Sequence, residues 1–310
     1  MTSKQLPRFK AFGVEENDYK FNPEYVTLSL DNISKPKFNG VYIPIKTKYE
    51  GGLETPLSIK FKTPVLTSTG LSRFENLLAN PIKCSLKLND TVLEDQHENG
   101  TLTPDDQFYF QARQDTMSTL TQIANTVKDL LRTEDVLNKC KNALSVPKSV
   151  SKINTTLDAW KAAVDAIVPY GKYSKDDRDS YYINPKVFQF KSSSDPGKEP
   201  YETKFTESIN VNGTLQKIKI PYEHAIEKYS QHSNNIFQVV AVIAIDSIWV
   251  KMTSSEVLCV LQTKLDSLLV LSTKPKQEIV EVEVSDRLLR AARCITSSEQ
   301  VRDENSTDSE

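Results

Sequence analysis

The stretch that decides the fold runs from Ile236 to Leu271. It reads Ile236-Phe-Gln-Val-Val-Ala-Val-Ile-Ala-Ile-Asp-Ser-Ile-Trp-Val-Lys-Met252, then Thr253-Ser-Ser-Glu256, then Val257-Leu-Cys-Val-Leu-Gln-Thr-Lys-Leu-Asp-Ser-Leu-Leu-Val-Leu271. Both apolar halves are rich in β-branched residues, which are enriched in strands. Four polar residues between two such runs suit a hairpin loop. The stretch therefore predicts one long hairpin that is strongly curved or forms part of a barrel.

Alternation of side chains along a strand assigns the residues of this hairpin to two faces. The first half is apolar on both faces, which is typical of a strand covered on both sides. One of these faces would carry Phe237, Val239, Ile243, Ile245 and Trp249. The second half alternates more cleanly, with Gln262, Lys264 and Asp266 pointing away from its apolar face. Trp249 is accordingly expected in the core and not on a binding surface.

The rest of the chain reads as strands on either side of a helical segment. Alternating residues predict strands over 24–30, 41–48, 57–66 and 84–88, and Asn212-Gly213 predicts a second hairpin over 204–220. Apolar residues recurring at spacings of three and four predict helices over 111–143 and 153–168. The polar residues 89–107 predict a loop.

These elements predict a mainly β (α+β) fold, a β-barrel with a helical insertion. The expected divisions are an N-terminal part of the barrel over 1–110, the insertion over 111–168, a C-terminal part over 169–295 that contains the hairpin 236–271, and an acidic tail over 296–310. The tail is expected to be disordered, because Ser, Glu, Asp and Asn dominate it.

The charge of the chain is unevenly distributed. The net charge is -2 over 310 residues, and the tail carries five acidic residues against Arg302, a net charge of -4. Subtracting -4 from -2 leaves +2 for the other 295 residues. A mildly basic body with an acidic tail is compatible with nucleic-acid binding.

The cysteines and the N-terminus indicate the compartment. None of the four cysteines, Cys84, Cys140, Cys259 and Cys294, lies in a CxxC pair. The N-terminus has no apolar signal region, and no apolar run approaches the length of a membrane span. We expect an intracellular, soluble, reduced protein without membrane contact.

No catalytic constellation stands out. The three histidines, His97, His224 and His232, show no HExxH spacing, and neither GxGxxG nor GxxxxGK[ST] occurs. The acidic pairs at Asp105-Asp106 and over 176–179 lie in polar stretches, where solvated charge is the simpler interpretation. We therefore expect no enzyme, no cofactor and no metal site.

Basic and aromatic residues interleave over 35–62. Lysines neutralise phosphates, and aromatic rings offer stacking faces to bases. The candidate nucleic-acid-binding residues are Lys35, Lys37, Phe38, Tyr42, Lys46, Lys48, Tyr49, Lys60, Phe61 and Lys62. A second, weaker cluster spans 170–191. A sheet with lysines on its solvent-exposed face and aromatic residues in its core would give the same residue pattern. A purely structural role for these residues therefore remains the alternative.

Two segments together carry a family resemblance. Lys35-Pro36 followed by Gly40-Val41-Tyr42, and the hairpin over 236–271 with Trp249 before its loop, resemble the OB-fold single-stranded-DNA-binding proteins of podovirus-type phages and large nucleocytoplasmic DNA viruses. The helical insertion and the acidic tail are similar to that family as well. Some family tails end in an aromatic residue, whereas this one ends in Asp308-Ser309-Glu310.

The resemblance implies an OB-like β-barrel and, if the protein is viral, a location in the host cytoplasm or nucleus. It also implies sequence-independent binding of single-stranded DNA in replication, repair or recombination, with replication proteins contacting the tail. The alternative is a β-rich virion or scaffold protein that binds other proteins. The sequence leaves open whether the chain forms a homo-oligomer, and whether DNA or RNA is preferred.

Overall fold

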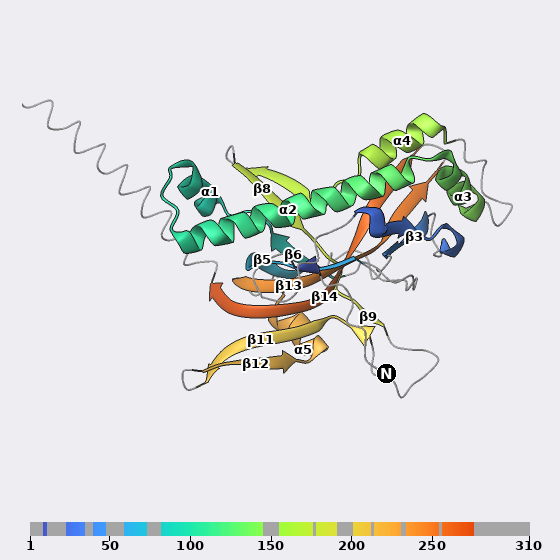
Figure 1. Cartoon of the computed structure of the whole chain (residues 1–310). Helices are drawn as coiled ribbons and strands as arrows, with labels where there is room; N and C mark the ends of the chain where they lie inside the picture. Colours follow the sequence, from blue (N-terminus) through green and yellow to red (C-terminus); the bar gives the residue numbers. More distant parts are fainter. Residues whose placement is uncertain are drawn as a thin grey trace, which may run out of the picture.

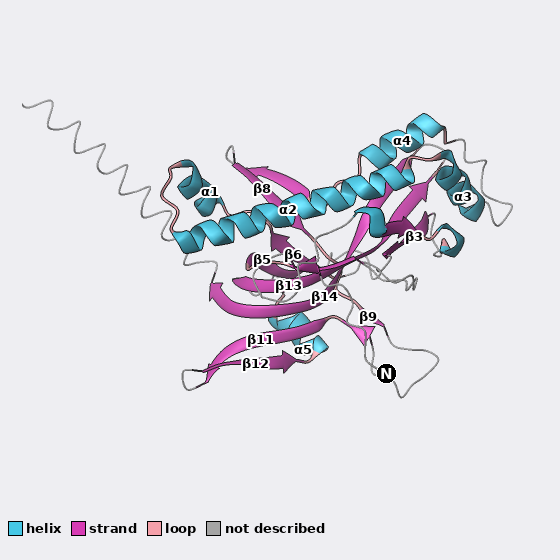
Figure 2. Ribbon diagram, in the orientation of Figure 1, coloured by secondary structure: helices cyan, strands magenta, loops and turns pink. Residues whose placement is uncertain are grey.

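The computed structural model describes residues 9–10, 23–34, 40–47, 59–72, 82–144, 155–175, 178–190, 201–211, 214–230, 234–253 and 256–275. Within these residues, twelve strands form one mixed sheet, and two more form a separate pair. Figure 1 shows α2 as the long helix that runs along the sheet, with α1 at its start and α3 and α4 beyond its end. The prediction of a mainly β fold is confirmed, as the ribbon coloured by secondary structure makes plain (Figure 2).

The long hairpin is the centre of the sheet, as predicted. Strands β13 (Asn235–Met252) and β14 (Val257–Pro275) pair antiparallel along their whole length. Three register shifts interrupt the pairing, between Gln238 and Val239, Val242 and Ile243, and Ile245 and Ser247. Each shift is a β-bulge, which bends the strand and increases its twist.

The other strands are attached to the two edges of this hairpin. The free edge of β13 pairs antiparallel with three strands in tandem: β3 (Gly40–Thr47), β4 (Ile59–Lys62) and β5 (Leu66–Ser72). The other edge of β14 pairs in parallel with β11 (Lys204–Val211), which forms the predicted second hairpin with β12 (Thr214–Ile220).

The sheet continues from β5 toward its second end. The strands in this direction are β6 (Lys83–Lys87), β8 (Arg178–Ile183) and β7 (Gly171–Lys175). Two short strands lie off this path: β1 (Phe9–Lys10) beside β4, and β2 (Val26–Leu28) beside β3. The separate pair is β9 (Gln189–Phe190) with β10 (Tyr201–Glu202). Two 3-10 turns, η1 (Pro23–Tyr25) and η2 (Leu30–Asn32), flank β2.

The prediction of an OB-like barrel is wrong, because the described strands form an open sheet. The hydrogen-bonded order runs β12-β11-β14-β13-β5-β6-β8-β7, an open sheet with β12 and β7 at its ends. The physical reason lies in the hairpin, whose strands are long enough for several partners each. β13 aligns three N-terminal strands end to end, and β14 takes β11 as its parallel neighbour, so the sheet spreads outward from the hairpin.

Helices fill the segment between β6 and β7, and they begin earlier than expected. They are α1 (Thr91–Glu98), α2 (Pro104–Leu131), α3 (Glu134–Leu144) and α4 (Leu157–Asp165). The predicted loop over 89–107 is wrong, because Asp90 and Thr103 are N-caps whose side chains accept hydrogen bonds from Val92 N–H and Asp106 N–H. Pro104 then occupies the first turn, where its missing N–H costs nothing. A fifth helix, α5 (Tyr222–Lys228), precedes β13.

The core lies on one side of the hairpin. α3 contacts β3 and α4 contacts β14, so the buried faces of these strands meet the helices. Trp160 of α4 is completely buried, and its indole N–H donates to Leu131 O (2.8 Å). Among the described residues, no helix is both long and apolar enough to cross a membrane.

Candidate nucleic-acid interface

A bulge exchanges the two faces of β13 just before Trp249. Ile245 pairs with Thr263 and Ser247 pairs with Gln262, so Asp246 is the extra residue. Before this point the buried residues include Ile243 and Ile245, and after it Ile248, Val250 and Met252. Trp249 therefore turns away from the core and is half-buried. The expectation that Trp249 shares a face with Phe237 is wrong, because counting by two fails across a bulge.

We call the side of β3, β4, β13 and β14 to which Trp249 belongs the outer face. Residues paired on neighbouring strands point to the same side of a sheet, so the register gives the rows of this face. One row is Tyr42, Trp249 and Val260. A second row is Lys60, Ala244 and Lys264, and a third is Lys62, Val242, Ser267 and Lys204. Two aromatic rings and several lysines thus share one surface.

The Trp249 side chain of the aromatic row packs closely against Gly40 of β3. A Cβ atom built on Gly40 would lie 2.5 Å from Trp249 Nε1 and 3.0 Å from the carbonyl oxygen of Val250. The indole therefore lies directly against the backbone of β3. Tyr42 is the cross-strand partner of Trp249, which puts the two Cβ atoms about 4.5–5.5 Å apart. Both side chains therefore belong to the outer face.

Two lysines of the outer face form ion pairs with aspartates of β13 and β14. Lys60 Nζ lies 2.8 Å from Asp266 Oδ1, and Lys264 pairs with Asp246. Asp246 and Asp266 are both bulge residues, so each bulge supplies a carboxylate beside a lysine. The side chains of Lys60 and Lys264 remain 25% and 33% exposed. These ion pairs are part-buried but still reach solvent, so a phosphate can compete with the carboxylates for the ammonium groups.

Four of the ten candidate residues meet on the outer face. Tyr42 and Lys46 are half-buried, Lys60 lies in its ion pair, and Lys62 is exposed. Phe61 is on the opposite side of β4 and only 2% exposed, so the stacking role expected for it is wrong. Alternation on a strand separates it from its two lysine neighbours. Five candidates lie outside the described residues: Lys35, Lys37, Phe38, Lys48 and Tyr49.

The structure adds residues that the sequence did not indicate. Trp249, Lys204 and Lys264 join the outer face from strands far along the chain. The signal for Lys264 was its place opposite the apolar residues of β14. No local pattern marks the bulge at Asp246, so the position of Trp249 could be found only from the pairing register.

The second basic and aromatic cluster does not form one surface. Tyr170 and Tyr181 pack edge to face with ring centroids 5.7 Å apart, and Phe188 is buried. Lys172 Nζ pairs with Asp179 Oδ2 at 2.7 Å, which raises the pKa of Lys172 and lowers that of Asp179. Tyr173 is 59% exposed at the β7 end of the sheet. Lys191 lies outside the described residues.

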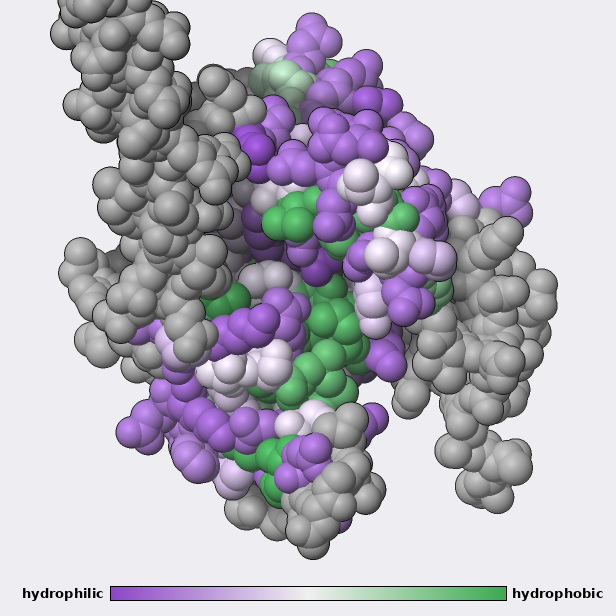
Figure 3. Space-filling model, turned by 90° about the vertical axis from the view of Figure 1, so that its left-hand side faces the viewer, coloured by the Kyte–Doolittle hydropathy of each residue, from purple (hydrophilic) through white to green (hydrophobic). Residues whose placement is uncertain are grey.

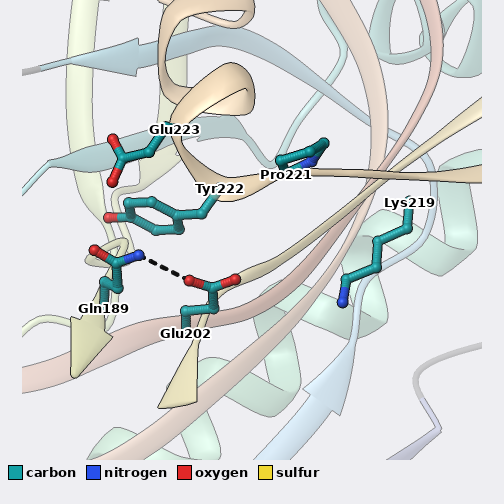
Figure 4. Close-up of a pocket in the computed structure, with 6 residues that line it drawn as sticks. All are labelled: Gln189, Glu202, Lys219, Pro221, Tyr222 and Glu223. Carbon is teal, nitrogen blue, oxygen red and sulfur yellow. Dashed lines mark hydrogen bonds between the residues drawn. The ribbon is translucent and has the colours of Figure 1, made fainter. Parts of the chain in front are cut away.

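A pocket of about 430 Å³ lies near the β11–β12 hairpin and α5. It is lined by Gln189, Glu202, Lys219, Pro221, Tyr222 and Glu223. Figure 4 shows Gln189, Glu202 and Tyr222 close together and Lys219 apart from them. Gln189 Nε2 donates to Glu202 Oε2 at 2.9 Å. The lining contains neither a histidine nor a cysteine, and it offers no pairing of a nucleophile with a base.

The end of the molecule that carries α1 has exposed apolar side chains. Val92 of α1 is 62% exposed, and Phe108 and Tyr109 of α2 are 53% and 44% exposed. Figure 3 faces this end and shows hydrophobic surface between hydrophilic areas. Acidic residues of the same helices, Asp105 and Asp106, stand next to the aromatic pair in the sequence, so this patch is unsuited to phosphates.

No group of three His, Cys, Asp or Glu side chains in the described ranges could hold a metal ion. His97 stacks on Phe110 with ring centroids 4.4 Å apart. Compared with protein-family models and with curated proteins, the sequence matches none of them.

Proposed function

We propose that the protein binds single-stranded nucleic acid without sequence preference, as expected of a single-stranded-DNA-binding protein in replication, repair or recombination, and that the outer face is its binding surface. The single observation that carries the proposal is the register of β3 and β13. It places Tyr42 beside Trp249 on the same side of the sheet as Lys46, Lys60 and Lys62.

The physical argument combines two kinds of contact. Aromatic rings stack on any base, at about 1–3 kcal/mol per base, which makes binding independent of sequence. Lysines neutralise phosphates and release counterions, which makes it sensitive to salt. An outer face with half-buried rings and flexible ammonium groups offers both. The aromatic rings can stack on the bases of a single strand directly, because no base pairs have to be opened first.

Salt dependence tests the electrostatic part. Binding of fluorescent oligo-dT should weaken as salt rises, with a slope of about -0.7 in log K against log salt for each phosphate neutralised. Double-stranded DNA of the same length is the control and should bind more weakly. If the protein showed no salt-sensitive binding to oligo-dT, the proposal would be contradicted.

The two tryptophans provide a test of the stacking part. The chain has only Trp160, which is buried, and Trp249. In the Trp160→Phe variant the remaining fluorescence comes from Trp249 and should be quenched when oligo-dT binds. The matched Trp249→Phe variant keeps Trp160 and should show binding weakened by roughly 1–3 kcal/mol with little quenching. Equal quenching in both variants would place the bases elsewhere. Circular dichroism checks that each variant is folded.

The competing function is that of a virion or scaffold protein. The exposed Phe108 and Tyr109 favour contacts with protein. Size-exclusion chromatography with and without oligo-dT separates the two. A self-assembling protein forms large species without nucleic acid, whereas a binding protein changes its elution when oligo-dT is added.

A further inference from the structure

Lys186 connects two strands that lie far apart in the order of the sheet. It forms isolated bridges with Lys83 of β6 and with Lys264 of β14. Its N–H donates to Thr263 O (2.9 Å), and its carbonyl accepts from Leu265 N–H (2.8 Å). Because bridged residues of adjacent strands point to the same side, the three lysine side chains project together. They extend the row of Lys60 and Lys264 across β14.

The Lys186 ammonium is fixed in this cluster. It donates to Gln262 Oε1. Gln262 is 6% exposed, and its Nε2 donates to Val260 O at 3.2 Å, which fixes the amide. A glutamine carbonyl satisfies a donor but brings no negative charge. Lys186 is therefore positioned without being neutralised by this partner.

The electrostatic surroundings of Lys186 are positive. Partial burial lowers the pKa of Lys186, and the charges of Lys83 and Lys264 lower it further. Asp246, which pairs with Lys264, acts in the opposite direction and does not cancel these effects. An anion placed among the three ammonium groups would relieve the repulsion between like charges.

We propose that Lys83, Lys186 and Lys264 form a phosphate-binding site on the outer face. One phosphate of the bound strand would sit among the three ammonium groups, and its oxygens would replace the Asp246 carboxylate at Lys264. The row continues past Ala244 to Lys60, so lysines recur across several strands, whose backbones lie about 4.8 Å apart. This arrangement favours a linear chain of phosphates over a single small anion. This inference rests on the proposed function and adds the path of the phosphate backbone.

The test uses the full-length protein in two assays. The site variant is Lys83→Gln with Lys186→Gln, and the matched control is Lys128→Gln with Lys161→Gln, which removes the same charge from α2 and α4. In the first assay, inorganic pyrophosphate is added during thermal unfolding, since a ligand of the folded state raises the melting temperature. The wild type and the control should be stabilised, whereas the site variant should lose this shift. Lys186→Arg should retain it.

The second assay is the salt series with oligo-dT. The site variant should lose about 0.7 from the magnitude of the slope, which corresponds to one phosphate contact, and the control should keep the wild-type slope. If the site variant keeps both the slope and the pyrophosphate shift, the site is wrong while the proposed function stands. If the wild type does not bind oligo-dT, the proposed function falls, and the path of the backbone falls with it.

Discussion

Single residues decide where the rings of the outer face lie, and Gly40 is the clearest case. The Cβ of an alanine here would meet Trp249 Nε1 at 2.5 Å and the Val250 backbone at 3.0 Å. The backbone cannot give way easily, so the indole must move. Glycine at this position is thus explained by close approach and not by an unusual backbone angle.

Gly40→Ala should displace Trp249 and cost about 1–3 kcal/mol of stability, the range for overpacking. The expected readouts are a shift of Trp249 emission in the Trp160→Phe background, a lower urea midpoint and weaker oligo-dT binding. Gly171→Ala is the control, because the nearest atom to its Cβ, Tyr182 O, is 3.8 Å away. Equal effects at both positions would contradict the role of Gly40.

Arg113 performs a structural task that the sequence did not reveal. Its side chain is 7% exposed, and its guanidinium donates to the carbonyls of Lys87, Leu88 and Asn89 at 3.4–3.5 Å, with Asp90 at 3.9 Å. It joins the end of β6 to α2. Burial lowers the pKa of Arg113, which Asp90 and Glu94 oppose.

Arg113→Ala should lower the free energy of unfolding by about 2–4 kcal/mol, because buried carbonyls lose their donor. Chemical denaturation measures this loss. Arg132→Ala removes an exposed arginine that pairs with Asp129 and Asp165, and it should leave the midpoint almost unchanged. If Arg113→Ala left the free energy of unfolding unchanged, water would be replacing the guanidinium as the hydrogen-bond donor without loss of stability.

At the scale of elements, the bulges of the hairpin set the chemistry of the outer face. The bulge at Asp246 keeps Ile248, Val250 and Met252 in the core while turning Trp249 outward. The bulge at Asp266 places a second carboxylate beside Lys60. If the same residues followed simple alternation with no bulge, Trp249 would lie on the buried face of Ile243 and Ile245.

Deleting Asp246 should leave the faces of the strand beyond it unchanged, because Ile245 and Ser247 already pair with the consecutive residues Thr263 and Gln262. The variant should fold with Trp249 still on the outer face and should lose the ion pair with Lys264. Deleting Ile248 instead would turn Val250 and Met252 outward, each worth about 1.5–3 kcal/mol of burial, so that variant should be unfolded or insoluble. Soluble yield and far-UV circular dichroism compare the two deletions. An Asp246 deletion that folds as poorly as the Ile248 deletion would contradict this account.

Hairpins and helices could be predicted from the sequence, whereas the pairing of distant strands could not. The apolar runs of β13 and β14 and the Asn212-Gly213 turn are local signals. The tandem alignment of β3, β4 and β5 on β13 depends on contacts between residues far apart in the chain. For this reason Tyr42, Lys60 and Lys62 could be selected as binding residues, but Phe61 was assigned to the wrong face and Trp249 to the core.

At the scale of the whole molecule, the outer face and the acidic tail have opposite charge tendencies. The body carries a net +2 and residues 296–310 carry a net -4. The tail lies outside the described residues, so its competition with nucleic acid stays a prediction. Two polyanions cannot occupy one basic surface at once.

Removing residues 296–310 should tighten oligo-dT binding by roughly 2- to 10-fold at low salt, with the difference fading at high salt because the interaction is screened. A variant that keeps the tail length but replaces its five acids by Asn and Gln should behave like the deletion. Unchanged affinity in both would remove the tail from the binding equilibrium and leave the outer face untouched.

The pairing of β13 with β3, β4 and β5 has a consequence for biosynthesis. The last of these N-terminal strands ends at Ser72, and β13 begins at Asn235. At synthesis rates of about 5–20 residues per second, the ribosome needs on the order of ten seconds or more to make the intervening chain. During that interval the apolar residues of β3 and β5 lack the partner that covers their edges. Folding must therefore wait for the C-terminal hairpin, and we expect slow refolding in vitro and dependence on chaperones during translation.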